Sequence, residues 1–268
     1  MARAFWKGAI NFGMVVIPVK MYVATRDERP RFHYLHKKCL TRPKQVYYCP
    51  KDEEYLSAQD MVRGYEYAKG EYVVFKESDF EKVPVKTTHT IDVVAFVDFS
   101  EVDPVYYYDG HYLEPEEIGE KPYCLFREVL KKTGRVAIAK VAFQRREHLC
   151  CIRPMDNILA LHTLHYAKEV LSPREITVND RELKEEELKM ASSLINEMTQ
   201  KFKPEQYKDQ YRIALEDMIE AKLQGREIVK VEEKAEEVPE LMDALRQSIE
   251  AARKTSAEKE KSASGAKK

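Results

Sequence analysis

The first 165 residues alternate short apolar runs with turn-forming residues. The runs are rich in Val, Ile, Tyr and Phe, which favour a pleated strand. Their spacing predicts a β-meander or barrel rather than alternating strands and helices. The expected strands lie within residues 9–25, 70–76, 87–99, 105–115, 135–144, 148–154 and 158–166.

One helix is expected to interrupt these strands, at residues 121–132 (KPYCLFREVLKK). Pro122 stands in its first turn, and Lys131 and Lys132 fill its last turn ahead of Gly134. Proline near the start, basic residues near the end and glycine just beyond the end are typical helix boundaries.

Two amphipathic helices are expected after residue 168. Between Leu183 and Phe202 apolar residues recur mostly at three- and four-residue steps, a stripe that only Glu187 breaks. Asp180 is placed to cap the start of this helix. Pro204 is expected to open the second helix, which also carries an apolar stripe.

The pattern as a whole predicts an α+β fold that is predominantly β. We expect a β-barrel core in residues 1–168 and a helical C-terminal arm in residues 169–228. Hydrophobic content falls beyond that point, and the last eighteen residues hold six basic and two acidic ones. Residues 229–268 are therefore expected to form a flexible charged tail.

Charge is balanced over the whole chain but unevenly distributed along it. The 45 basic residues face 46 acidic ones, so net charge indicates no partner. Residues 26–51 hold eight basic and two acidic residues, however, and residues 120–153 hold nine basic and three acidic ones. Two such blocks predict a localised anion-binding surface. The competing interpretation is a solvated face held by cross-strand ion pairs.

The second basic block contains a candidate hairpin. Arg145, Arg146 and Glu147 separate two apolar runs and are expected to form the loop between two strands. Two arginines at a loop tip suit phosphate contact, because the guanidinium fork matches phosphate oxygens. A solubilising tip without a ligand is the alternative.

Cysteine usage favours a reducing compartment. The five cysteines are an odd number without the spacing of secreted proteins, and the N-terminus lacks the apolar region of a signal peptide. No run approaches the length of a membrane span. We therefore expect a cytoplasmic protein with free thiols and no membrane partner.

Three residues suggest half of a zinc site. His36 and Cys39 could form one arm and Cys49 part of another, with His33 or Asp52 needed to complete four ligands. A loop with two free thiols is the simpler interpretation.

Catalytic chemistry finds little support in the sequence. Cys150 and Cys151 are adjacent, so in a strand they point to opposite faces and cannot bind one ion together. Cys150 shares a face with His148, but nothing nearby proposes an orienting group or an oxyanion site. Nucleotide-binding, zinc-protease and hydrolase signatures are also missing. The sequence favours a binding protein that is not an enzyme and needs no cofactor.

Five blocks, in order, resemble the bacterial Ku family of non-homologous end joining. They are AFWKGAINFGMVVIPVKMY (4–22), VRGYEYAKGEYVVF (62–75), VDPVYYYDGHYLEPEE (102–117), VAIAKVAFQRREHLCCIRP (136–154) and a helical block at 187–228.

The resemblance implies a homodimeric ring through which duplex DNA threads. It places an extended bridge in the polar insertion, for which residues 26–63 are the candidate. It also implies binding of double-stranded DNA ends, recruitment of the ATP-dependent DNA ligase D, a place at the nucleoid and no catalysis. The basic residues expected to contact DNA are Arg29, Arg31, Lys37, Lys38, Arg42, Lys44, Arg145 and Arg146.

Two other hypotheses stay open at this point. One is a zinc-containing protein that binds or processes nucleic acid through His36, Cys39 and Cys49. The other is a basic β-barrel adaptor for an acidic protein or RNA.

Overall fold

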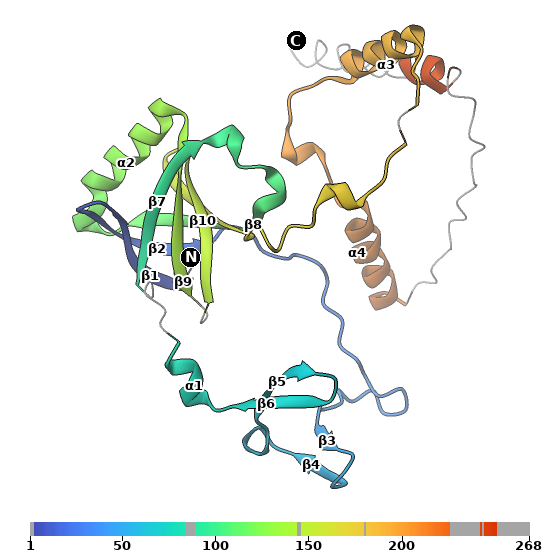
Figure 1. Ribbon diagram of the computed structural model, residues 1–268. Helices are drawn as coiled ribbons and strands as arrows, with labels where there is room; N and C mark the ends of the chain where they lie inside the picture. Colours follow the sequence, from blue (N-terminus) through green and yellow to red (C-terminus); the bar gives the residue numbers. More distant parts are fainter. Residues whose placement is uncertain are drawn as a thin grey trace. The chain divides into compact units, whose positions relative to one another are not determined.

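A closed β-barrel forms the core of the protein (Figure 1). The structure, a computed structural model, describes residues 3–83, 89–143, 146–179, 181–225, 242 and 244–250. The strands follow one another around the barrel in the order β1-β2-β8-β11-β10-β9-β7. In chain order they are β1 (Trp6–Phe12), β2 (Val15–Val23), β7 (Thr90–Asp98), β8 (Tyr107–Pro115), β9 (Arg135–Phe143), β10 (Arg146–Met155) and β11 (Ile158–Leu164).

One parallel pairing closes the barrel. All other neighbours are antiparallel, but β1 and β7 run in the same direction, with Ala9 opposite Thr90 and Asn11 opposite Asp92. The Asn11 amide also donates to the Asp92 carboxylate at 3.1 Å. Closure leaves no barrel strand with an unpaired edge. The strands expected at 9–25, 87–99, 105–115, 135–144, 148–154 and 158–166 are confirmed, the first as the hairpin β1–β2 turned at Gly13 (φ 59°).

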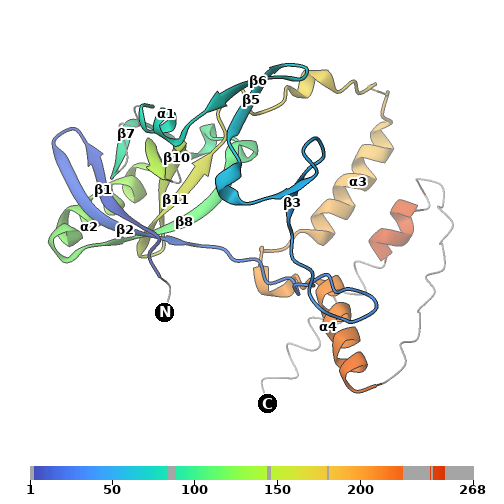
Figure 2. The ribbon, with the colours of Figure 1, turned by 90° about the horizontal axis from the view of Figure 1, so that it is seen from below.

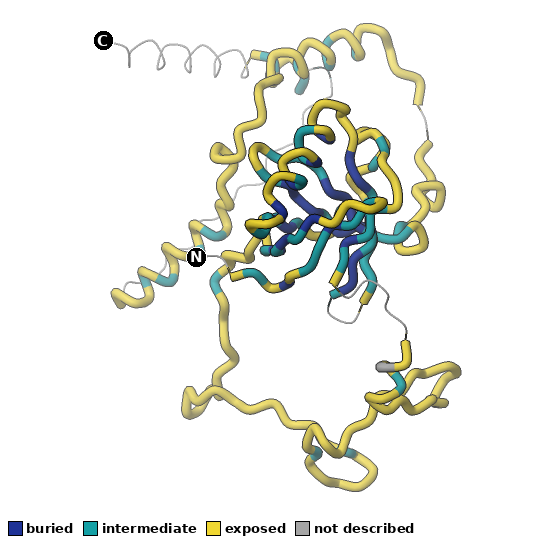
Figure 3. Tube along the Cα trace, turned by 90° about the vertical axis from the view of Figure 1, so that its left-hand side faces the viewer, coloured by how far each residue is buried: buried dark blue, intermediate teal, exposed yellow. Residues whose placement is uncertain are grey.

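The alternation of side chains fills two separate clusters. Cys150 lies in the barrel interior with Ile10, Ile17 and Ile152, whereas Cys151 packs outside the barrel wall beside Val136 and Leu164. The prediction that the two cysteines face opposite ways is therefore confirmed. Burial is concentrated in the barrel, as Figure 3 shows in dark blue.

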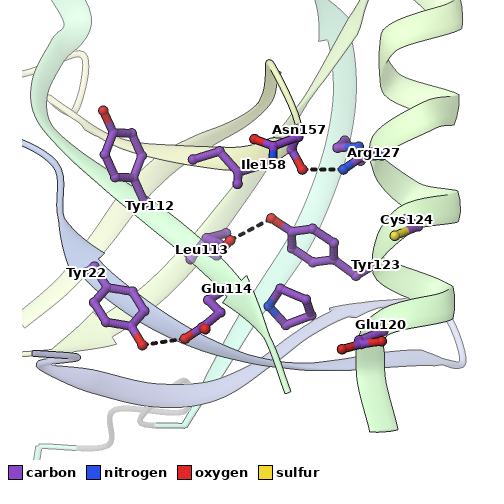
Figure 4. Close-up of a pocket in the computed structure, with 11 residues that line it drawn as sticks. Tyr22, Tyr112, Leu113, Glu114, Glu120, Tyr123, Cys124, Arg127, Asn157 and Ile158 are labelled. Atoms are coloured by element: carbon purple, nitrogen blue, oxygen red, sulfur yellow. Dashed lines mark hydrogen bonds between the residues drawn. The ribbon is translucent and has the colours of Figure 1, made fainter. Parts of the chain in front are cut away.

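Helix α2 (Glu120–Thr133) packs against strands β2, β9 and β10 (Figures 1 and 2). Tyr123, Phe126 and Leu130 join the interior cluster, and Gly134 ends the helix with φ 67°. The buried Tyr123 hydroxyl donates to the Leu113 carbonyl at 2.6 Å (Figure 4). It also accepts a hydrogen bond from the Leu159 amide at 2.7 Å. This hydroxyl fastens the helix to two barrel strands, and the helix predicted at 121–132 is confirmed.

The chain between β2 and β7 forms two small sheets outside the barrel. β3 (Tyr47–Cys49) pairs with β4 (Glu54–Leu56), and β5 (Arg63–Ala68) pairs with β6 (Glu71–Phe75), which is followed by α1 (Glu77–Glu81). The prediction that residues 70–76 belong to the barrel is wrong. Strand propensity shows that a segment is extended, but the partner strand decides which sheet it joins.

Helices α3 (Glu185–Met198) and α4 (Gln210–Leu223) follow the barrel, and neither contains a buried residue. Residues 244–250 are also helical. Asp180 lies outside the described residues. Glu187 caps α3 instead, because its carboxylate accepts the Lys184 amide at 2.9 Å, which explains why a carboxylate interrupts the apolar stripe.

The prediction that Pro204 opens the second helix is wrong. Pro204–Gln206 is a single 3₁₀ turn, and α4 begins after Asp209, whose carboxylate accepts the Arg212 amide at 3.0 Å. Proline fits the first turn of either helix type, so the capping aspartate decides where the α-helix starts. The other 3₁₀ turns are η1 (Ala58–Asp60), η2 (Phe99–Glu101), η3 (Pro104–Tyr106), η4 (Glu117–Gly119) and η5 (Pro173–Glu175).

By its internal contacts the chain divides into two compact units. One comprises Met1–Glu28 and Phe32–Pro173, and the other comprises Arg29–Arg31 and Arg174–Lys268. Across the described residues, no helix has both the length and the apolar character needed to cross a membrane.

Candidate nucleic-acid interface

The first basic block, residues 26–51, lies in an exposed stretch with almost no regular structure before β3. A turn presents two of its lysines. The His36 amide donates to the Thr41 carbonyl at 2.9 Å and the Leu40 amide to the His36 carbonyl at 2.7 Å, with Leu40 in the left-handed region (φ 55°). Lys37 and Lys38 therefore stand at the tip of a closed turn, extended toward solvent.

The cations of this block are mostly without protein partners. Arg26 is held by Glu28. In the described part of the chain no carboxylate forms an ion pair with the following residues: Arg31, Lys37, Lys38, Arg42 and Lys44. Unpaired cations in an exposed segment are free to contact phosphate oxygens.

Half of the described cations of the second basic block, residues 120–153, form ion pairs, including Arg135 with Asp98. Lys140 Nζ lies 3.0 Å from Glu147 Oε1, and Arg146 pairs with Glu169. Arg127 contacts the Glu128 carboxylate at 2.9 Å and donates to the Asn157 carbonyl (Figure 4). The ion-pair interpretation therefore holds for half of the described cations of this block, whereas Lys121, Lys131 and Lys132 form no ion pair in the described structure.

The loop expected at Arg145, Arg146 and Glu147 is shorter than predicted. Arg146 is paired opposite Phe143 at the start of β10, so only two residues connect the strands, and Glu147 lies within the strand. Arg145 lies outside the described residues. Arg146 keeps 58% of its side chain exposed despite its pairing with Glu169, and its contact with DNA stays a prediction.

The candidate zinc ligands form two separate pairs. His36 Nδ1 lies 2.9 Å from Cys39 Sγ, and the Cys49 thiol donates to the Asp52 carboxylate at 3.1 Å. Within the ranges that the structure covers, no three His, Cys, Asp or Glu side chains converge as a metal site would require. The described residues thus do not assemble the four-ligand site of the zinc hypothesis.

The pKa of the exposed thiol in the first basic block and the pKa values of the buried barrel thiols shift in opposite directions. Hydrogen bonds from Thr41 and His36 lower the pKa of the exposed Cys39. Burial raises the pKa of Cys150 and raises that of Cys151 to about 11. A protonated, buried thiol is inert as a nucleophile. Cys150 donates instead to the Ala139 carbonyl at 3.3 Å, which gives the Cys–His nucleophile no geometric support.

The sequence analysis missed a set of exposed aromatic side chains outside the barrel. Every residue of β5 and β6 is exposed, including Tyr65, Tyr67 and Tyr72. Tyr47 and Tyr48 of β3 are exposed as well. No sequence signal identifies the first three as exposed, because Tyr65-Glu66-Tyr67 alternates like a half-buried strand. Aromatic side chains near unpaired cations can stack on nucleic acid or cover a protein surface.

The sequence of this chain is similar to that of proteins with known names. Residues 11–190 match the family model described as the Ku70/Ku80 beta-barrel domain. A protein of Solibacter usitatus named non-homologous end joining protein Ku is 40% identical over 98% of this chain and 100% of its own length. Its namesake in Archaeoglobus fulgidus is 42% identical over 93% of this chain and 99% of its own.

A third relative is longer than this chain. The protein of the same name in Symbiobacterium thermophilum is 41% identical over 93% of this chain, which spans 63% of that relative's length. The resemblance noted from five sequence blocks is confirmed by these matches, as is the β-barrel that it implies. The chain belongs to the Ku family.

Proposed function

We propose that this chain binds the ends of double-stranded DNA without reading their sequence, in non-homologous end joining. The observation that carries the proposal is the exposed basic segment between β2 and β7, in which Lys37, Lys38, Arg42 and Lys44 have no ion-pair partner among the described residues. Its relatives from Solibacter usitatus and Archaeoglobus fulgidus are named as end-joining proteins. The chain contributes binding rather than catalysis.

The chemistry of this segment suits sequence-independent recognition. Lys37, Lys38, Arg42 and Lys44 meet phosphates on any duplex and release condensed counterions as they do so. Phosphate contacts position a protein on DNA but carry no base information. A repair protein that must accept any broken end needs this kind of contact.

A second copy of the chain completes the DNA-binding form as a homodimeric ring. Helices α3 and α4 expose apolar side chains such as Ile195, Met198 and Met218, and neither helix buries a residue. Amphipathic helices owe most of their stability to packing of the apolar face. A partner subunit supplies that packing surface, and a closed ring restricts loading to DNA ends.

Recruitment of the ATP-dependent DNA ligase D follows from the family and completes the repair reaction. The residues that contact the ligase are not assigned. Arg29, Arg31, Arg145 and Arg146 are proposed as further phosphate contacts, on charge and placement.

A gel-shift comparison tests the ring directly. The full chain is titrated against one plasmid in linear, nicked and closed circular form at moderate salt. A ring that loads at ends shifts the linear form and binds the closed circular form much more weakly. Equal affinity for all three forms would sink the proposal. Sedimentation velocity of the same sample measures the dimer, and a monomer at the binding concentration would contradict it.

A further inference from the structure

The surface around the C-terminal half of α2 has no role in the proposed DNA contacts. It holds two adjoining cavities of about 440 Å³ and about 240 Å³. Leu130 and Arg135 line both cavities, so they form one continuous groove around the end of the helix. We name this surface the α2 groove.

The larger cavity is apolar and open to solvent. Three aromatic rings form one wall: Phe12 stacks on Phe126 with centroids 4.8 Å apart, and Phe96 contacts both rings at 6.4 and 6.2 Å. Leu125 and Val129, one helical turn apart on α2, remain 66% and 47% exposed. Contiguous exposed apolar surface of this kind marks an interaction site.

The smaller cavity is cationic. Lys131, Arg135 and Arg153 line it, together with the ring of Phe99. Arg135 Nε lies 3.9 Å from the Asp98 carboxylate, and Arg153 Nε points to His162 Nε2 at 3.1 Å. Three cations thus line this cavity, and only Arg135 of the three forms an ion pair with a carboxylate in the described structure. The end of α2 adds partial negative charge, so side chains rather than backbone amides must hold an anion here.

An apolar cavity beside a cationic cavity suits a ligand that has an apolar part next to an acidic part. Apolar side chains fit against the aromatic wall, and carboxylates that follow them reach the cations at the end of the helix. Duplex DNA fits poorly, because phosphates need a row of cations and the larger cavity presents apolar side chains apart from Arg135.

We propose that the α2 groove is a docking site for a peptide segment of a partner protein that carries apolar anchors followed by acidic residues. Such an occupant uses both cavities at once, as helix-in-groove and extended-peptide recognition do elsewhere. The site is separate from the proposed DNA contacts, so it can hold a partner while DNA is bound.

Selection from a random peptide library displayed on phage, with the full-length protein as bait, tests the proposal. The expected peptides share leucine or aromatic residues followed by aspartate or glutamate. Fluorescence anisotropy then measures one selected peptide on variants. Leu125→Lys is expected to weaken binding at least about tenfold, since anchors dominate such interfaces. Lys131→Glu is expected to weaken it about fivefold.

Two control substitutions outside the groove test whether a loss of peptide binding is specific to the groove. Lys132→Glu changes the same charge in the same helical turn but lines neither cavity, and Ile118→Lys changes an exposed apolar residue away from the groove. Both are expected to bind the peptide as the unaltered chain does. All four substitutions fall on exposed side chains, and thermal unfolding confirms that each variant folds.

Several outcomes would overturn the proposal. They are selected peptides without acidic residues, equal losses in the matched variants, or no selected peptide at all. Displacement of the peptide by linear duplex DNA would reassign the groove to DNA. A changed oligomeric state in Leu125→Lys would reassign it to the subunit contact. Retained binding of linear DNA by the groove variants keeps this test independent of the proposed end-binding function.

Discussion

The two basic blocks of this chain carry the same excess of positive charge but differ in how many of their cations form ion pairs. In residues 26–51 the lysines of the turn are exposed and have no carboxylate partner in the described structure. In residues 120–153, Arg135, Lys140 and Arg146 pair with carboxylates, and Arg127 pairs with a carboxylate and donates to a backbone carbonyl. Charge composition therefore identifies candidate surfaces, and the fold decides which charges remain available for a ligand.

The two blocks differ because the barrel brings carboxylates close to its cations. Barrel strands bring together residues that are distant in sequence, so Arg146 meets Glu169 and Arg135 meets Asp98. The turn of the first block lies outside the barrel, where no paired strand brings a distant carboxylate to Lys37 or Lys38 in the described structure, and Arg26 pairs with its sequence neighbour Glu28. Lys37 and Lys38 keep their charges free because no carboxylate among the described residues pairs with them.

The largest difference between the exposed segment at residues 26–51 and the barrel should appear in the rate at which their thiols react. Cys39 is exposed and its pKa is lowered, whereas Cys150 and Cys151 are buried and their pKa values are raised. We expect iodoacetamide to modify Cys39 at least about 1,000-fold faster than either barrel cysteine, which reacts only after unfolding. Mass spectrometry of peptides after timed labelling measures each rate. Rapid labelling of Cys150 in the folded protein would contradict the buried core.

DNA affinity should separate the two basic blocks next. Replacing Lys37, Lys38, Arg42 and Lys44 with glutamate is expected to weaken binding of any duplex at least about 100-fold and to reduce its salt dependence. The matched variant replaces Lys121, Lys131, Lys132 and Arg135 in the same way; it removes the same charge at residues not proposed to contact DNA and should change affinity by less than about fivefold. Filter binding over a salt series measures both. Equal losses would show that the free charges of the first block are not the DNA contacts.

A smaller effect is expected from one hydroxyl in the barrel. Tyr123→Phe leaves the Leu113 carbonyl and the Leu159 amide without their partner in a buried place, which should lower the free energy of unfolding by about 1–3 kcal/mol. Urea unfolding measures the change. Tyr65→Phe on the exposed ribbon β5–β6 serves as control and should stay within about 0.5 kcal/mol of the unaltered chain.

The smallest expected effect is a pH dependence of the free energy of unfolding that comes from two histidines of the barrel. Burial lowers the pKa of His111 and of His148 below their ordinary value of 6.5. The unfolded chain therefore binds protons more readily, so stability is retained above pH 6.5 and falls as the pH drops through the folded-state values. Thermal unfolding between pH 7.5 and pH 5.5 measures the fall. The double variant His111→Leu, His148→Leu should show a shallower fall, and an unchanged slope would assign it to other groups.

The sequence by itself determined the local structure and the family. Strand propensity and turn residues located six of the seven expected strand regions in the barrel, and proline, lysine and glycine bounded α2. These features are local, because propensity and capping act over a few residues. The opposite faces of Cys150 and Cys151 followed from the two-residue period of a strand.

Only the tertiary structure decided which elements meet. Glu71–Phe75 joins a separate ribbon instead of the barrel, β1 closes the barrel against β7, and Asp209 rather than Pro204 sets the start of α4. The same holds for the α2 groove, whose cations come from α2, β9 and β10. Pairing across long sequence separations depends on packing and closure of the whole barrel, and no short stretch of sequence contains that information.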